Sequence, residues 1–480
     1  MEEEAKVPLL ERVSEGPHCE ESENVVRRAW SETRKLWAIA APSIFSRIAM
    51  FSMTVVSQAF AGHLTVLDLT AVSIATTVII AISFGFLLGM ASALETLCGQ
   101  SYGAKQYHLL GIHLQRSWIV MFITSILLLP LFIFATPILQ LIGTSQTVAE
   151  LSGVVAVWLI PLHLSFPFQF TLQRFLQSQL KMAVIAYVSG GALLIHVIIS
   201  WVFVFRLRVG VVGIALTIDF SWWLSVFCLF GYIVGGGCRK TWTGFSNEAF
   251  SGLWDFLKLS ISSGVMLSLE NFYYRVLIIV SSQMKNAETS VDAVSICISI
   301  FAWESMIMLG CLAATGVRVA NELGAGNAKG SKFATNVSIL NALVVGLVLS
   351  SVIVGFDKNL AMIFTSNNDV IKVVEDFAML LGFTILLNSF QPILSGVAIG
   401  SGWQALVAVI NIGSYYAVGV PIGIIAGWLF QFGVKGMWLG MISGTLVQTI
   451  ILAVVLFRCN WQKEAEKALR RVGKETSSGS

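Results

Sequence analysis

The sequence predicts an all-α polytopic membrane protein whose twelve transmembrane helices form two pseudo-symmetric six-helix lobes. Of its 480 residues, 56% are hydrophobic and only 12% are charged, whereas a soluble domain carries about 25% charged residues. The apolar residues come in blocks long enough for helices of about 20 residues, as a bilayer core requires. Finally, motifs of the first half recur in the second half.

The apolar blocks are separated by charged or Gly- and Asn-rich breaks, and each block predicts one span. We expect the twelve spans at residues 36–60, 70–96, 115–139, 149–171, 182–205, 211–234, 257–282, 291–316, 333–356, 371–394, 404–428 and 434–457.

The loops after even-numbered spans hold more Lys and Arg than those after odd-numbered spans, and both tails are basic near the membrane. This bias places both termini in the cytosol. The acidic N-terminal segment lacks a signal-peptide pattern, and its Glu4 and Leu9-Leu10 resemble a dileucine sorting signal for a vacuolar or endosomal address. The chain thus divides into a disordered cytosolic tail, an N-lobe, a linker, a C-lobe and a cytosolic tail, at residues 1–35, 36–234, 235–256, 257–457 and 458–480.

An internal repeat relates the two halves at an offset of about 222 residues. Three short motifs recur at equivalent places relative to the spans: AVSIA at 71–75 as AVSIC at 293–297, GA at 103–104 as GA at 324–325, and GVVG at 210–213 as GVKG at 433–436. Because each half holds an even number of helices, both halves enter the membrane the same way up. A pseudo-two-fold axis should therefore run along the membrane normal, with a cleft between the lobes that suits alternating access.

Four longer motifs carry a family resemblance. They are LETLCGQSYGA at Leu94–Ala104, VRVANELGAGN at Val317–Asn327, QAFAGH at Gln58–His63 and LSGVAIGSGWQ at Leu394–Gln404. These motifs resemble the plant, DETOXIFICATION-type branch of the multidrug and toxic compound extrusion (MATE) transporters. The resemblance implies a twelve-helix antiporter that exports organic solutes in exchange for protons or sodium ions. Plant members are similar carriers of flavonoids, alkaloids, citrate, hormones or xenobiotics, at the vacuolar or plasma membrane.

One position departs from the pattern of many plant members. They carry Asp in the tenth span, where this chain has Asn388, and a subgroup resembling flavonoid and vacuolar transporters shares the Asn. Because Asn cannot titrate, any proton-coupling group must lie elsewhere.

Two carboxyl groups lie near the middle of predicted spans, and we expect them to couple transport to protons. They are Glu270 in the seventh span, which matches the acidic residue of the family there, and Glu304 in the eighth, which matches the Trp-Glu pair of the subgroup. Placing an ionisable group at that depth of the membrane costs about 2.5–3.5 kcal/mol, so such a group is expected to have a functional or structural role. The alternative for each is a structural hydrogen bond or ion pair.

Arg47 lies midway along the first span, and the repeat offset places it at the position equivalent to Glu270. We expect it to hold a partner carboxylate or an anionic substrate group, because Arg stays charged and binds carboxylates bidentately. A permanent bridge within its own lobe is the alternative. Arg275 either extends outward or meets Glu304. Asp219, in the sixth span, is expected to pack between helices, and Glu95 to anchor a loop.

Polar and aromatic residues at membrane depth complete the candidate substrate cleft. Burying an amide costs free energy unless it makes hydrogen bonds, for example to a substrate. Flat or cationic substrates can stack on aromatic rings. With Arg47, the candidates are Gln58, Asn271, Tyr273, Trp303, Asn388, Gln391 and Asn411.

The leading interpretation is a proton-coupled antiporter of organic solutes, and an anion channel or carrier on the same fold is the alternative. Neither a metal-ligand pattern nor a nucleophile–base pair is present, so no cofactor, metal or enzymatic activity is expected. The segment Gly324–Gly330 lacks the Gly-Lys-Ser/Thr ending of a phosphate-binding loop. The expected partners are a small organic solute, protons or sodium ions, and lipid, without nucleic acid. We expect a monomer, since two lobes make their own cleft.

Overall fold

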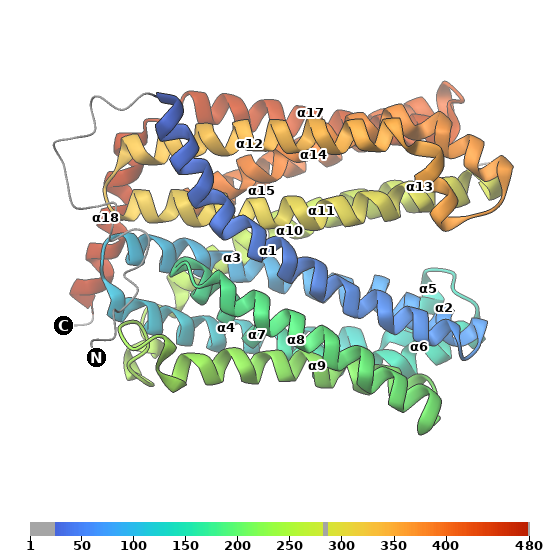
Figure 1. Cartoon of the computed structure of the whole chain (residues 1–480), viewed down its shortest axis with the longest axis horizontal. Coiled ribbons are helices and arrows are strands. Elements are labelled where there is room, and N and C mark those ends of the chain that lie inside the picture. Colours follow the sequence, from blue (N-terminus) through green and yellow to red (C-terminus); the bar gives the residue numbers. More distant parts are fainter. Residues whose placement is uncertain (1–24, 282–286, 479–480) are drawn as a thin grey trace.

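The computed structural model describes the backbone of residues 25–281 and 287–478, and the side chains of residues 25–273 and 293–475. Within these residues every regular element is a helix, as the sequence predicts. Figure 1 shows two groups of helices that lie side by side. The two groups come together near helix α18 and diverge toward the other end of the bundle (Figure 1).

The first group is the N-terminal lobe. Its α-helices are α1 (Val25–Gly62), α2 (Val66–Ile74), α3 (Ala81–Gly103), α4 (Tyr107–Ile133), α5 (Ala135–Leu141), α6 (Gln146–Trp158), α7 (Ile160–Ser178), α8 (Met182–Trp201) and α9 (Val211–Tyr232). A π-helical stretch, Ala75–Ile80, joins α2 to α3, and shorter ones extend α8 to Arg206 and α9 to Gly237.

The second group is the C-terminal lobe. Its helices are α10 (Leu253–Ser281), α11 (Ala287–Gly324), α12 (Ala328–Gly355), α13 (Asp357–Phe364), α14 (Asn368–Ser401), α15 (Gln404–Asn411), α16 (Val420–Ile424), α17 (Gly433–Phe457) and α18 (Trp461–Ser478). π-helical stretches, Ile412–Gly419 and Ile425–Leu429, make one continuous span of α15 and α16.

The twelve-span prediction is confirmed, although one span is bent. Nine helical segments of the described chain are long and apolar enough to cross a membrane, and α6 with α7 makes a tenth across a 47° bend. The two other predicted spans coincide with α10 and α14. Proline explains the bend, because Pro161 at the start of α7 has no N–H to continue the α6 hydrogen-bond ladder. The freed Leu162 N–H instead donates to Asp219 Oδ1 at 3.1 Å, so Asp219 has the packing role expected of it.

Both predicted tails contain helix, although only the N-terminal one was predicted to be disordered. Helix α1 begins at Val25, so residues 25–35 of the predicted disordered tail are helical. The predicted C-terminal tail forms helix α18, whose residues Trp461, Ala465, Ala468 and Val472 are buried. These positions recur every three or four residues, which gives one apolar face along α18.

Short polar side chains set several helix starts. Thr65 accepts the Asp68 N–H at 3.0 Å, and Asn327 accepts the Gly330 N–H at 2.9 Å, at the starts of α2 and α12. Such caps satisfy N–H groups that the first turn leaves without partners. Gly402 ends α14 in the left-handed conformation (φ 83°), which favours glycine.

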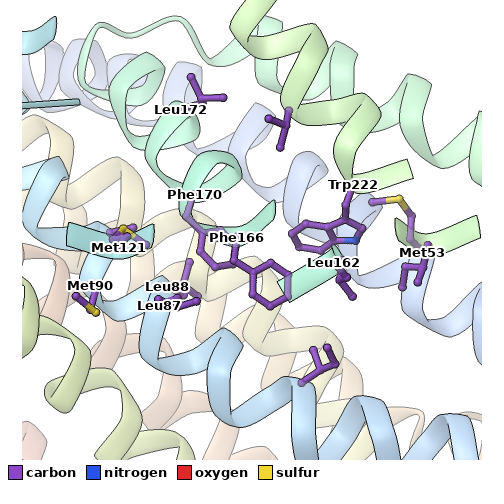
Figure 2. Close-up of a cluster of buried hydrophobic side chains, with 14 of the residues drawn as sticks. Met53, Leu87, Leu88, Met90, Met121, Leu162, Phe166, Phe170, Leu172 and Trp222 are labelled. Atoms are coloured by element: carbon purple, nitrogen blue, oxygen red, sulfur yellow. The ribbon is translucent and has the colours of Figure 1, made fainter. Parts of the chain in front are cut away.

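The core of the N-terminal lobe is rich in aromatic residues. Figure 2 shows Phe166, Phe170 and Trp222 among methionine and leucine side chains. The rings of Phe166 and Trp222 are 5.1 Å apart, and the ring of Phe84 meets that of Phe170 edge-on at 5.1 Å. These rings are closely packed with one another, so they build the lobe rather than an open binding site.

The two lobes meet in a seam near α18, formed by the recurring motifs. Gly103 of α3 lies against the carbonyl oxygen of Asn321 in α11, and Gly324 of α11 lies against the carbonyl oxygen of Gln100 in α3. The repeat offset that relates Gly103 to Gly324 also relates Gln100 to Asn321. The seam is therefore pseudo-symmetric, and a side chain at either glycine would separate the backbones.

Candidate functional site

Glu304 and Asn388 form a buried pair between α11 and α14. The Asn388 amide Nδ2 donates to Glu304 Oε2 at 2.7 Å, and both side chains are about 95% buried, with 4% and 5% exposed. The other carboxyl oxygen, Oε1, is buried without a hydrogen-bond partner among the described residues. One oxygen of this carboxyl is thus fixed by an amide while the other remains available to carry a proton.

Glu270 of α10 has a similar neighbour on α14. The Gln391 side chain interacts with the Glu270 carboxyl, and Gln391 Nε2 also donates to Ser395 Oγ at 3.2 Å. Asn388 and Gln391 are three residues apart, so they project from neighbouring positions of α14. This helix therefore connects both predicted coupling carboxyls through amide side chains.

Arg47 lies beside a buried ion pair in its own lobe. Arg174 Nη1 is 2.6 Å from Glu95 Oε2, and both side chains are almost fully buried. Arg47, on the facing helix α1, has Glu95 and Arg174 as its charged neighbours. Among the described residues, no carboxylate oxygen lies within 4 Å of Arg47, so neither a close bridge nor a pairing with Glu270 is found.

Glu95 has a different place from the one expected. The prediction of a loop anchor is wrong, because Glu95 is buried inside α3 and pairs with Arg174 of α7. A side chain at Gly316 would meet Glu95 Oε1, so this carboxyl also borders α11 of the other lobe. The predicted fourth span ends at residue 171 and so leaves Arg174 in a loop. In the structure α7 continues to Ser178, and Arg174 is part of it.

Two of the cleft candidates, Trp303 and Asn271, contact the opposite lobe, whereas Gln58 is bound within its own. The rings of Phe51 in α1 and Trp303 in α11 meet edge-on at 5.0 Å across the lobes, and Trp303 is 39% exposed. The Asn271 amide of α10 faces Gly85 of α3. Gln58 is bound to Thr76 Oγ1 at 3.3 Å within the N-terminal lobe.

Tyr273 and Asn411 are held inside the C-terminal lobe. The Tyr273 hydroxyl donates to the Gly440 carbonyl at 2.7 Å, and its ring stacks on Tyr415 at 4.5 Å. Asn411 Nδ2 donates to the Met266 carbonyl at 3.0 Å, and Asn411 Oδ1 accepts from Gln448 Nε2 at 3.0 Å. In this conformation both side chains serve packing. The Arg275 side chain lies outside the described ones.

Sequence reasoning missed a polar network in the N-terminal lobe. His196 Nε2 is 3.1 Å from Ser57 Oγ, and its Nδ1 is 3.0 Å from Ser221 Oγ. This network links α1, α8 and α9 and leaves the histidine fully buried. Small hydroxyls spaced along apolar spans were its only signal.

In the part of the chain that the structure describes, no cluster of three His, Cys, Asp or Glu residues could hold a metal ion.

Two helical lobes that close at one end, with polar and charged side chains between and within them, define the class of a multi-span membrane transporter. The comparisons with known proteins agree. The MatE family model matches residues 42–202 and 263–425. Protein DETOXIFICATION 27 of Arabidopsis thaliana is 54% identical over 98% of this chain and 97% of its own, and Protein DETOXIFICATION 20 of the same plant is 47% identical over 96% and 94%.

The solved structures show the same fold. The eukaryotic MATE transporter AtDTX14 superposes with a TM-score of 0.89 at 33% identity, over 92% of this chain and 99% of that one. A multidrug resistance MATE transporter in an outward-facing conformation gives 0.78 at 16% identity, over 92% and 97%. The chain belongs to the multidrug and toxic compound extrusion family, in its plant branch. It is a transporter and not an enzyme.

Proposed function

We propose that the protein is an antiporter that exports or sequesters organic solutes, including flavonoids, xenobiotics and organic cations, in exchange for protons. The cleft between the lobes opens alternately to the two sides of a vacuolar or plasma membrane, and both termini lie in the cytosol. The α18 side is then the cytosolic side, and it is closed in this conformation.

The observation that carries the proton coupling is the Glu304–Asn388 pair. Because Asn388 donates to Oε2 only, a proton can reside on Oε1 without breaking that hydrogen bond. Protonation removes a buried negative charge while the packing of α11 on α14 is kept. Asn388 thus serves as a hydrogen-bond donor where many plant members carry a second acid.

Glu270 is the second coupling group in this proposal. Its neighbour Gln391 lies one helical turn from Asn388, so a shift of α14 would change the surroundings of both carboxyls together. A proton gradient can drive transport only if the two cleft orientations differ in proton affinity. Movement of α14 relative to α10 and α11 would supply that difference.

Substrate would enter between Trp303 and Asn271 on one lobe and Gln58 on the other. The exposed face of Trp303 offers a stacking surface for flat aromatic or cationic solutes. The two amides offer both donors and acceptors to hydroxylated solutes.

The test is efflux of a fluorescent cation and of a flavonoid glycoside from proteoliposomes, with and without an imposed pH gradient. Glu304→Gln and Glu270→Gln should abolish gradient-driven transport and leave passive exchange intact. Glu150→Gln is a matched control, since this acid is exposed and accepts a hydrogen bond from the neighbouring Gln146. Gradient-driven transport that survives in both variants would refute the proposed coupling groups.

An anion channel or carrier is the second candidate, and the placement of Arg47 favours it. Because no carboxylate oxygen of the described chain lies within 4 Å of it, this guanidinium can receive an anionic group of a solute. Chloride flux that Arg47→Gln removes and Glu304→Gln leaves unchanged would support this function over antiport. Arg47→Lys keeps the positive charge but loses the two parallel N–H donors of the guanidinium, so it shows which of the two an anion needs.

A further inference from the structure

Helix α18 bridges the two lobes on the side where they are closed. It follows α17 after only residues 458–460, so it is tied to the C-terminal lobe. In Figure 1 it lies across the end of the bundle, at the same end as the first turns of α1. Its first half packs on the C-terminal lobe, and its last turns add contacts to the N-terminal lobe while Lys474 stays 3.8 Å from Asp255 of α10.

The first half of α18 packs on the C-terminal lobe. Trp461, Ala465 and Ala468 join a hydrophobic cluster with residues of α11, α14 and α17. Glu464 Oε2 accepts the Trp403 indole N–H at 3.0 Å. These contacts and the short connection to α17 hold this half in place.

The last turns of α18 bind the N-terminal lobe. Arg471 Nη1 donates to Gln100 Oε1 at 2.9 Å, at the seam itself. Val472 packs with Leu109 and Ile112 of α4. Glu475 forms an ion pair with Arg116, whose side chain is only 6% exposed.

The seam beneath α18 must open in any cycle of alternating access. Gln100, which Arg471 holds, also donates to the Gly400 carbonyl of α14 at 2.9 Å. When the lobes separate here, α18 cannot stay bound to both.

We propose that α18 is a latch whose last turns, from Arg471 to Glu475, release the N-terminal lobe whenever the α18 side opens. The strength of these contacts sets the fraction of time that this side is closed. The inference rests on the alternating access of the proposed function and does not depend on the coupled ion. Arg471, Val472 and Glu475 are then positioning residues, since they act on the cleft through the lobes.

The test compares two acid-to-amide changes on the same helix. Glu475→Gln removes the ion pair with the N-terminal lobe, whereas Glu464 is bonded to Trp403 of the C-terminal lobe and to Lys467 of α18 and reaches the latch only through its charge near Arg471. Each is placed in a Ser178→Cys background. Ser178 is fully buried, and its carbonyl accepts from Asn321 of the opposite lobe at 3.4 Å. Labelling by a membrane-impermeant maleimide from the α18 side then reports seam opening, after subtraction of the parent protein without the reporter.

We expect Glu475→Gln to raise the labelling rate about fivefold, at the lower end of typical coupling between sites. Glu464→Gln should raise it much less, because it removes no bond to the N-terminal lobe. Arg116→Gln should also raise the rate, although it additionally removes the hydrogen bonds of Arg116 to the Glu248 carbonyl and to Ser251 Oγ. The double variant should raise the rate by less than the two single changes combined, because both remove the same ion pair. An unchanged melting temperature excludes global unfolding as the cause.

Equal labelling in Glu475→Gln, Glu464→Gln and the parent would overturn the latch, as would fully additive effects of Glu475→Gln and Arg116→Gln. Should Glu475→Gln unfold the protein, Val472→Ala probes the same contact without a charge change, and it too must raise the rate. Because labelling needs no ion gradient, a latch without proton-driven transport would refute only the proposed coupling.

Discussion

The buried pair of Glu95 and Arg174 allows the two partners to be ranked by the cost of removing each. Glu95→Gln leaves buried Arg174 and half-buried Arg47 as neighbouring cations without their anion. Arg174→Gln leaves Glu95 with Arg47 as its remaining cation. Breaking a buried ion pair costs about 3–5 kcal/mol. We expect Glu95→Gln to cost that much, and Arg174→Gln to cost less than about 3 kcal/mol, because Arg47 compensates in part.

The assay is thermal unfolding of the purified variants in one detergent, at low and high salt. A surface control is Asp376→Asn, which removes the exposed pair with Lys435 and should cost less than about 1 kcal/mol. Since the buried pair is shielded from ions, added salt should not reduce the difference between Glu95→Gln and the parent. A larger destabilisation by Arg174→Gln than by Glu95→Gln would refute the idea that the charge of Arg47, beyond 4 Å, partly compensates Glu95.

Two further predictions concern the seam and the C-terminal lobe. Gly103→Ala places a methyl group against the Asn321 carbonyl, so labelling of the seam should become faster. Gly413→Ala is the control, because a methyl group there meets open space and should not change labelling. Equal labelling of the two variants would contradict the tight seam. Tyr273→Phe removes a buried hydrogen bond to a backbone carbonyl of α17 and should lower the free energy of unfolding by about 1 kcal/mol. Tyr187→Phe, at a position 80% exposed, is its control in the same melting assay, and identical melting temperatures would contradict the role of the bond.

Hydropathy predicted the spans well, because the bilayer sets a helix length that composition reveals directly. It could not predict α18, since an amphipathic helix outside the membrane spans has few apolar residues, and the sequence of a basic tail does not show that it docks on the lobes. The same limit affected the count of basic loop residues. Arg318 follows the predicted eighth span and so contributes to the basic bias of the even-numbered loops, yet it pairs with Glu32 and Glu322.

The sequence predicted which residues belong to the candidate site better than it predicted which of them contact one another. Sequence depth selected Glu304 and Asn388, and the structure joins them by a hydrogen bond. Tyr273 and Asn411 share that depth but face the interior of their lobe. The depth of a residue in the membrane follows from its position along the helix. The direction in which its side chain points depends on how the helix is rotated against its neighbours, and a helix that is apolar on all sides does not reveal that rotation.

The repeat therefore conserves backbone geometry and not chemistry. Gly103 with Asn321, and Gly324 with Gln100, make equivalent close approaches across the seam, because both lobes must meet by the same backbone surfaces when that side closes. The position of Glu270 in one lobe, however, is that of Arg47 in the other. A carboxyl can exchange a proton, whereas a guanidinium keeps its charge throughout the cycle. If the proposal holds, the C-terminal lobe carries the proton and the N-terminal lobe offers a constant positive charge. Proton and solute then need not compete for the same group.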